Sequence, residues 1–142
     1  MKNPFLEMHP LQKEPVLYVR LGGHEGILKF IRPFYMDIRQ HETLGPIFNR
    51  QIQDWDAHLK KISEFWALQA GGPSLYRGGF AAAHLRFDLE PEMFDMWLAL
   101  WDFNCNRQLE PELAQAMSSL AHEMARRLKR VVAMHSPPQE QE

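Results

Sequence analysis

The sequence predicts a single all-α domain. In four separate segments, apolar residues recur at intervals of three and four positions, which is the spacing of an amphipathic helix face. No alternating polar and apolar stretch of useful length occurs, so we expect no strands, and no internal repeat is present. With 142 residues the chain is long enough to bury one core, and its single cysteine can form no internal disulfide.

Residues 1–17 contain three prolines and have mixed polarity, so we expect an extended N-terminal arm. After the glycine pair Gly22-Gly23, a helix is expected as far as about Gln40. Its apolar face comprises Ile27, Phe30, Ile31, Phe34, Tyr35 and Ile38. Pro33 falls inside this pattern, removes one backbone donor and crowds the carbonyl group of Lys29. A kink or a break is therefore expected there.

The tripeptide Leu44-Gly45-Pro46 is expected to form a turn. The next helix is expected to begin near Asp54, whose side chain suits the N-cap position. Its apolar face comprises Trp55, Leu59, Ile62, Phe65 and Trp66. Gly71-Gly72-Pro73 is expected to end this helix. The glycine-rich residues 73–83 are expected to form a loop before a short turn at His84.

Two further helices are each opened by a proline, a residue that is favoured in the first helical turn. Pro91 precedes one apolar face and Pro111 precedes the other. The two faces comprise Met93, Phe94, Trp97, Leu98 and Trp101, and then Leu113, Met117, Leu120, Met124, Leu128 and Val131. We therefore expect one helical domain over residues 18–134, followed by a disordered Pro/Gln/Glu-rich tail over residues 135–142.

The composition excludes several classes of protein. Because 16 basic and 18 acidic residues give a net charge of −2, the chain has no field suited to nucleic acid. No apolar run approaches the length of a membrane span or of a signal peptide. The single cysteine fits a reducing compartment. We therefore expect a cytoplasmic protein with neither a nucleic-acid nor a membrane partner.

His84 is the first functional candidate, because it lies in a stretch of small and apolar residues. Tyr35, Phe48, His58 and Trp97 fall on or beside apolar faces of the expected helices. Together these five residues indicate a haem pocket, in which a neutral imidazole in an apolar wall holds the iron. Because no Cys-x-x-Cys-His motif occurs, such a haem would be held without thioether bonds. For His84 taken alone, a core histidine bonded to a carbonyl group is the alternative.

The helix that carries His58 is expected to cross the opposite face of the haem. Ile62, Phe65 and Trp66 would form an apolar ceiling there. Lys61 neighbours His58 on the helix surface and would pair with a haem propionate at the pocket mouth. The alternatives are an edge histidine with its tip in water and a solvated lysine.

Tyr35 and Trp97 each place a polar hydrogen on an otherwise apolar face. A phenol O–H and an indole N–H are donors suited to a small ligand such as O2. One such bond contributes on the order of 1 kcal/mol, and each ~1.4 kcal/mol changes affinity roughly tenfold. The alternative is that both residues are ordinary core aromatics.

Five motifs follow one another along the chain. They are Phe34-Tyr35, Leu44-Gly45-Pro46-Ile47-Phe48-Asn49, Trp55-x-x-His58-x-x-Lys61-x-x-x-Phe65-Trp66, His84, and Phe94-x-x-Trp97-Leu98. Over roughly residues 18–132 the chain resembles the truncated haemoglobin family, which implies a globin-like two-over-two helical sandwich. The string over residues 44–49 and His58 are most like the third group of the family. By contrast, Leu21-Gly22-Gly23 and Gly71-Gly72-Pro73-x-x-Tyr76 are similar to the first and second groups.

The resemblance implies a role for each candidate. His84 would be the proximal ligand of the haem iron, and His58 would be a distal ligand when no other ligand is present. Tyr35, His58 and Trp97 would line the distal pocket and stabilise the bound ligand. The residues implied to contact the haem are Phe48, Lys61, Ile62, Phe65, Tyr76, Arg86, Phe87 and Phe94.

Two departures from the family pattern bear on these roles. The second group usually carries a basic residue directly before the proximal histidine, but Ala83 occupies that position here. Arg86 or Arg77 would then pair with the propionate on that side. Pro33 lies two residues before Tyr35 and would alter the direction of its hydroxyl group.

The sequence therefore predicts a haem b protein whose ligands are O2, NO and CO. Simple binding, oxygen transport, NO dioxygenation and peroxidase-like activity stay open, with transport ranked below the redox activities because a heavily bonded pocket releases O2 slowly. Redox turnover would need a separate reductase, since no flavin or nicotinamide motif occurs. The alternatives are a haem-free or haem-sensing helical interaction module and a non-haem metal site formed by His58 and His84.

Overall fold

The computed structural model describes residues 15–79, 84 and 89–135. Over these residues the chain is helical and contains no strand, so the predicted all-α fold is confirmed. The helices are α1 (Val16–Arg20), α2 (Gly23–Gln40), α3 (Leu44–Gln51), α4 (Trp55–Gln69), α6 (Pro91–Gln108) and α7 (Pro111–His135). In the part of the chain that is described, no helix is both long enough and apolar enough to cross a membrane.

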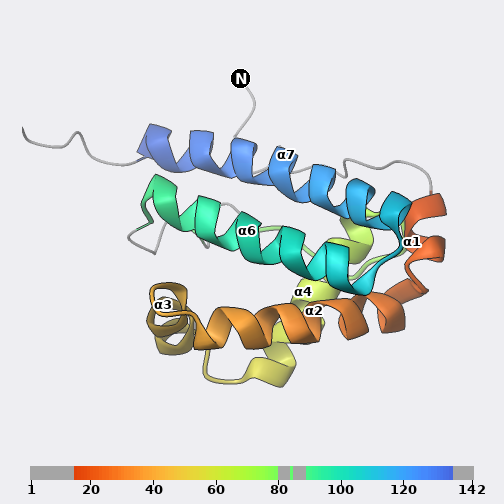
Figure 1. Ribbon diagram of the computed structural model, residues 1–142, viewed down its shortest axis with the longest axis horizontal. Helices are drawn as coiled ribbons and strands as arrows, with labels where there is room; N and C mark the ends of the chain where they lie inside the picture. Colours follow the sequence, from red (N-terminus) through yellow and green to blue (C-terminus); the bar gives the residue numbers. More distant parts are fainter. Residues whose placement is uncertain (1–14, 80–83, 85–88, 136–142) are drawn as a thin grey trace, which may run out of the picture.

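The four long helices form two pairs (Figure 1). α6 and α7 run antiparallel side by side, and α2 packs against α4. α2 also contacts α6, and this contact joins the two pairs. The short helix α3 packs against the end of α2, whereas α1 contacts both α2 and α7 at the opposite end of the molecule. This arrangement is the two-over-two helical sandwich that was predicted.

α2 continues through Pro33, so the break that was one of the two outcomes predicted there is wrong. A proline in a helix interior costs ~3 kcal/mol or more, because it lacks an N–H group and crowds the preceding turn. The predicted apolar face lies on both sides of Pro33 and is buried along its whole length: Ile27, Phe30, Ile31, Phe34, Tyr35 and Ile38. Burial of each large apolar side chain contributes ~1.5–3 kcal/mol, so the shared face outweighs the local cost.

The turn predicted at residues 44–46 is wrong, because these residues form the start of α3. Pro46 lies in the first helical turn, where backbone N–H groups have no partner within the helix, so its missing N–H costs little. His41 caps this end of α3. Its Nδ1 accepts hydrogen bonds from the backbone N–H groups of Thr43 and Leu44, each at 3.1 Å.

The other predicted helix starts are confirmed. Asp54 is the N-cap of α4, and its Oδ1 accepts a hydrogen bond from the backbone N–H of Ala57 at 3.1 Å. Pro91 and Pro111 are the first residues of α6 and α7. Residues 73–79 form the predicted loop after α4. Short-range capping rules thus located these ends correctly.

α1 forms partly within the segment that was expected to be an extended arm. Residues 16 and 17 belong to its first turn, and Leu17 is buried in the core at 5% exposure. The prolines in this segment predicted an extended chain. Burial of Leu17 in the core instead favours a helix at residues 16 and 17. The rest of the predicted arm, over residues 1–14, and the predicted tail beyond His135 lie outside the described residues.

A hydrogen-bond network, which we name the clasp, joins α1, α2, α4 and the loop after α4. The Tyr18 hydroxyl lies 2.6 Å from His24 Nδ1, and His24 Nε2 lies 2.9 Å from Glu64 Oε1. The same Glu64 oxygen accepts a hydrogen bond from the backbone N–H of Leu75 at 2.8 Å. Gly72 fits beneath the Tyr18 ring, where an added Cβ would lie 2.3 Å from the ring carbons. The clasp therefore holds the first residues of the loop against α4.

Candidate functional site

A cavity of about 370 Å³ lies between α2, α3, α4, α6 and α7. Its wall is mostly apolar with a few polar groups, and its volume is typical of cofactor pockets, which span roughly 300–1,000 Å³. The wall comprises Tyr35, Leu44, Phe48, Gln51, Ile52, His58, Lys61, Ile62, Phe65, Trp66, His84, Leu89, Met93, Phe94, Trp97, Ala121, Met124, Ala125 and Leu128.

Two partly buried histidines lie on this wall, His58 on α4 and His84 in the connection between α4 and α6. Burial lowers the pKa of His58, and the charges of Lys61 and His84 lower it further. His58 therefore stays neutral near neutral pH. Because the influence of His84 reaches His58, the two imidazoles belong to one electrostatic environment. Neutral imidazole is the form of histidine that binds a metal ion.

The donor groups on the wall fit haem. The described part of the wall offers imidazole nitrogens but neither a carboxylate nor a thiolate. Among the described residues, no three His, Cys, Asp or Glu side chains gather as a metal-binding group. Haem iron needs only axial ligands from the protein, since the porphyrin supplies the equatorial nitrogens. The aromatic and aliphatic wall suits the apolar faces of a porphyrin.

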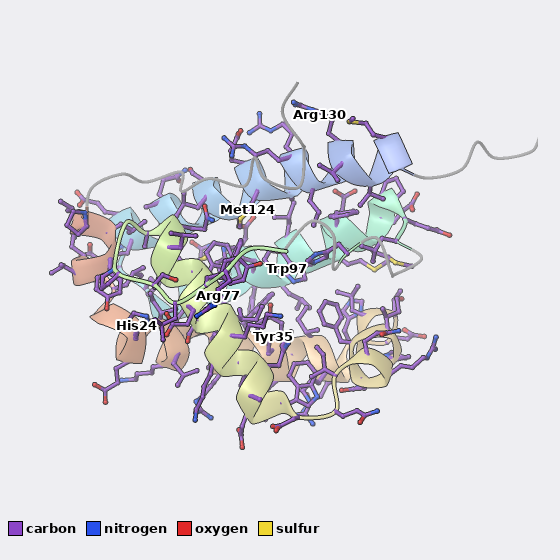
Figure 2. The ribbon with its side chains drawn as sticks, turned by 180° about the vertical axis from the view of Figure 1, so that it is seen from behind. His24, Tyr35, Arg77, Trp97, Met124 and Arg130 are labelled. Carbon is purple, nitrogen blue, oxygen red and sulfur yellow. The ribbon has the colours of Figure 1, made fainter. Side chains whose placement is uncertain are left out.

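Tyr35 and Trp97 are hydrogen-bonded to each other at this wall. Because an indole N–H can only donate, Trp97 donates to the phenol oxygen of Tyr35, whose own O–H stays available to another acceptor. Burial raises the pKa of Tyr35 well above its usual value, although the bond from Trp97 acts in the opposite direction. The Tyr35 ring stands edge-on to His58, with the ring centroids 6.2 Å apart. The structure therefore brings the three predicted distal residues together, and Figure 2 shows Tyr35 and Trp97 on the interior sides of α2 and α6.

A layer behind the wall fixes these polar side chains. Trp55 contacts both Tyr35 and His58, with centroid separations of 5.9 Å and 5.7 Å. The guanidinium group of Arg39 lies 4.7 Å above the Trp55 ring, within the range of a cation–π contact. Trp55 was predicted on a helix face and within a motif of the family, but nothing in the local sequence indicates that it supports two polar neighbours.

Most of the residues predicted to contact a haem lie on the cavity wall. These are Phe48, Lys61, Ile62, Phe65 and Phe94. Tyr76 is not part of the wall, because its ring packs edge-on against Phe65 with the centroids 5.1 Å apart, and burial raises its pKa to about 12. Arg86 and Phe87 lie outside the described residues. Arg77, the other predicted propionate partner, is exposed on the loop (Figure 2).

The sequence did not predict the part of the wall that α7 supplies. Ala121, Met124, Ala125 and Leu128 all line the cavity, and Figure 2 labels Met124 on this helix. The apolar face of α7 was predicted from its periodicity. However, the same periodicity describes residues that pack on other helices and residues that line a cavity, so this signal alone could not separate them.

The fold and the cavity together define a class of protein. A two-over-two helical sandwich whose central cavity carries imidazole, phenol and indole groups is a truncated globin. The chain belongs to the bacterial-like globin family, whose sequence model matches residues 16–129. Globins generally bind haem, and through it they hold diatomic gases.

Within this family the chain is most like the group III truncated haemoglobins, as predicted. It is 34% identical over 110 residues to the group 3 truncated haemoglobin ctb of Campylobacter jejuni, which covers 72% of this chain and 85% of that protein. The crystal structure of the group III truncated haemoglobin from Campylobacter jejuni matches 81% of this chain and 94% of that chain, with a TM-score of 0.73 and 30% identity. A cold-adapted truncated haemoglobin from the Antarctic bacterium Pseudoalteromonas haloplanktis TAC125 matches 79% of this chain and 95% of that chain. Its TM-score of 0.69 at 20% identity supports the fold alone.

Proposed function

We propose that this protein is a b-type haem protein that binds O2 and other diatomic ligands, with His84 as the proximal iron ligand. The observation that carries the proposal is the single cavity wall that includes His84, His58, Tyr35 and Trp97. Membership of the globin family supports it, because globins generally bind haem. NO and CO are the other ligands that we expect.

The wall offers the residues that would hold the haem. Phe48, Ile62, Phe65 and Phe94 present apolar surface suited to the faces of a porphyrin. Lys61 is exposed while it also borders the cavity, so its ammonium group would pair with a propionate. When bound, haem supplies an iron centre that accepts small ligands and exchanges electrons.

The polar side chains of the wall would act on the ligand as hydrogen-bond donors. Tyr35 stays protonated because burial raises its pKa, and its oxygen already accepts a hydrogen bond from Trp97. Its O–H is therefore free to donate to a ligand. Neutral His58 offers a second donor or, at rest, an axial nitrogen. Each bond contributes about 1 kcal/mol, so two donors slow ligand escape on the order of tenfold or more.

A pocket that retains its ligand suits redox chemistry better than transport. We therefore rank NO dioxygenation and peroxidase-like activity ahead of O2 transport. Dioxygenation combines NO, O2 and one electron to give nitrate, so each turnover requires an electron from a separate reductase. The cytoplasm is the compartment that we propose, since the single cysteine, Cys105, is buried and free.

Absorbance spectra of the purified protein test this proposal. We expect a Soret band with stoichiometric haem, and we expect His84→Ala to lose or strongly alter it. The matched control is His122→Ala, because His122 lies outside the cavity wall and pairs with Asp102 at 2.8 Å. Failure of the wild-type protein to take up haem would overturn the proposal and favour a haem-free interaction module.

A further inference from the structure

Three tryptophans stack face to face behind the cavity. Trp66 lies on Trp101 with the ring centroids 4.5 Å apart and the planes inclined by 24°. Trp101 lies on Trp97 at 5.1 Å, with the planes only 11° from parallel. Trp66 and Trp97 line the cavity, whereas Trp101 has no exposed surface and is absent from the wall. Trp101 is therefore the middle ring of a stack whose two outer members border the ligand site.

The position of Trp101 is fixed from several sides. Its Nε1–H donates a hydrogen bond to the backbone carbonyl oxygen of Met117 on α7, at 3.0 Å. Phe30 and Phe34 each stand edge-on to its ring, with centroid separations of 5.0 Å. An indole with one hydrogen bond, two edge contacts and both faces covered has a single orientation available.

Trp97 is held less completely. One part of its ring borders the cavity, so the packing that orients it comes from the Trp101 face and from an edge contact with Phe34 at 5.0 Å. The direction of the Trp97 N–H depends on the plane of this ring. That direction decides whether the N–H reaches the oxygen of Tyr35.

We propose that Trp101 is a positioning residue for the ligand pocket. By holding the ring plane of Trp97, it aims the Trp97 N–H at the Tyr35 oxygen, and this bond occupies one lone pair of that oxygen and restricts the directions in which the Tyr35 O–H donates to a ligand. Trp101 is absent from the cavity wall, so it acts on the pocket through the rings packed on it, and of these Trp97 carries the N–H that bonds to Tyr35. This inference rests on the proposed function of the cavity as a site for diatomic ligands.

The test uses the haem-loaded protein and its variant Trp101→Phe. We expect O2 dissociation to become about three- to tenfold faster, the factor that corresponds to weakening one hydrogen bond to the ligand. We also expect the infrared stretching band of bound CO, which is one dominant band in the wild type, to shift or split as Trp97 adopts several orientations. The CO band reports the polar groups around the ligand, so it would not respond to a purely structural role.

Phe30→Leu is the matched control. It removes another aromatic contact of Trp101, but Phe30 is buried, is not on the cavity wall and lies on the edge of Trp101 instead of its face. This variant should lower the melting temperature while keeping the wild-type CO band and dissociation rate. Equal spectral changes in the two variants would overturn the inference, because loosening of the core in general would then explain them.

Other outcomes separate this inference from the function on which it rests. A wild-type CO band and dissociation rate in Trp101→Phe would overturn the positioning role while leaving ligand binding intact. If Trp101→Phe does not fold, Trp101→Tyr takes its place with the same deciding outcomes. Several CO bands of similar intensity in the wild type would also contradict a fixed Trp97. A wild-type protein without a Soret band would instead overturn the proposed function.

Discussion

Replacing Tyr35 with phenylalanine removes one oxygen atom from the cavity wall and leaves the ring in place. The ring would keep its edge-on contacts with Phe34 and His58, at centroid separations of 4.8 Å and 6.2 Å. The variant therefore loses little packing. It loses the O–H donor for the ligand and the acceptor for the Trp97 N–H.

The size of the effect follows from these losses. One hydrogen bond contributes about 1 kcal/mol, or about 1.5–3 kcal/mol when the acceptor carries charge. Since ~1.4 kcal/mol corresponds to a factor of ten, we expect O2 dissociation to become tenfold faster or more. In Tyr35→Phe the Trp97 N–H no longer has the Tyr35 oxygen as its acceptor, so it can donate to the ligand. This new bond would limit the increase in the O2 dissociation rate.

The assay is stopped-flow mixing of the reduced, O2-equilibrated protein with excess CO, which reports the O2 dissociation rate. Tyr18→Phe is the control, because it removes the same atom from a tyrosine that bonds to His24 and is not part of the cavity wall. Because burial raises the pKa of Tyr35, the wild-type rate should show no ionisation step below about pH 10, the ordinary tyrosine value. An unchanged rate in Tyr35→Phe would place the hydroxyl beyond reach of the ligand and refute the reasoning.

Three further predictions concern other parts of the molecule. The pKa of His58 is lowered, so its imidazole should be neutral above about pH 6.5. Below that pH, protonation is harder in the folded protein than in the unfolded chain, so the free energy of unfolding should fall as the pH falls. A spectral transition in this acid range should accompany that loss and be absent from His58→Leu; its persistence in the variant would assign it to another group. Asp54→Ala should lower the free energy of unfolding by about 1 kcal/mol in a denaturant titration, because α4 loses its N-cap, whereas Asp56→Ala should have a smaller effect. Burial raises the pKa of Cys105 to about 12, so a thiol reagent should leave the native protein unmodified at about pH 8 and react only on unfolding; rapid native labelling would contradict the buried position.

The sequence predicted the long helices because two kinds of local signal agreed. Apolar residues recurred at helical spacing, and the N-cap residue Asp54 and the first-turn prolines Pro91 and Pro111 marked where helices begin. The errors arose where one local signal competed with long-range packing or with another local signal. Pro33 indicated a break, yet the buried face of α2 continues past it. Residues 44–46 were assigned to a turn, although a helix start tolerates proline and His41 supplies the cap.

The part of the site that the sequence predicted is the part marked by polar side chains on otherwise apolar helix faces. His58, Tyr35 and Trp97 are polar groups on apolar faces, so their positions indicated a pocket, and the cavity wall includes all three. The wall from α7 and the stacking of Trp101 depend on which helices meet. That information lies in pairs of residues far apart in the chain. No local spacing within α6 or α7 could have revealed it.

The clasp has a consequence for His84, the iron ligand that we propose. It holds the backbone of Leu75 against Glu64, and Leu75 precedes His84 in the sequence by only nine residues. An anchored residue close in sequence restricts the volume that the His84 side chain can sample. This restriction raises the effective concentration of the imidazole at the cavity. Loss of the hydrogen bond between Glu64 and Leu75 would release this anchor and lower the effective concentration of the His84 imidazole at the cavity. No residue of the cavity wall would be changed. We therefore expect the clasp to strengthen haem binding through His84 from outside the cavity wall.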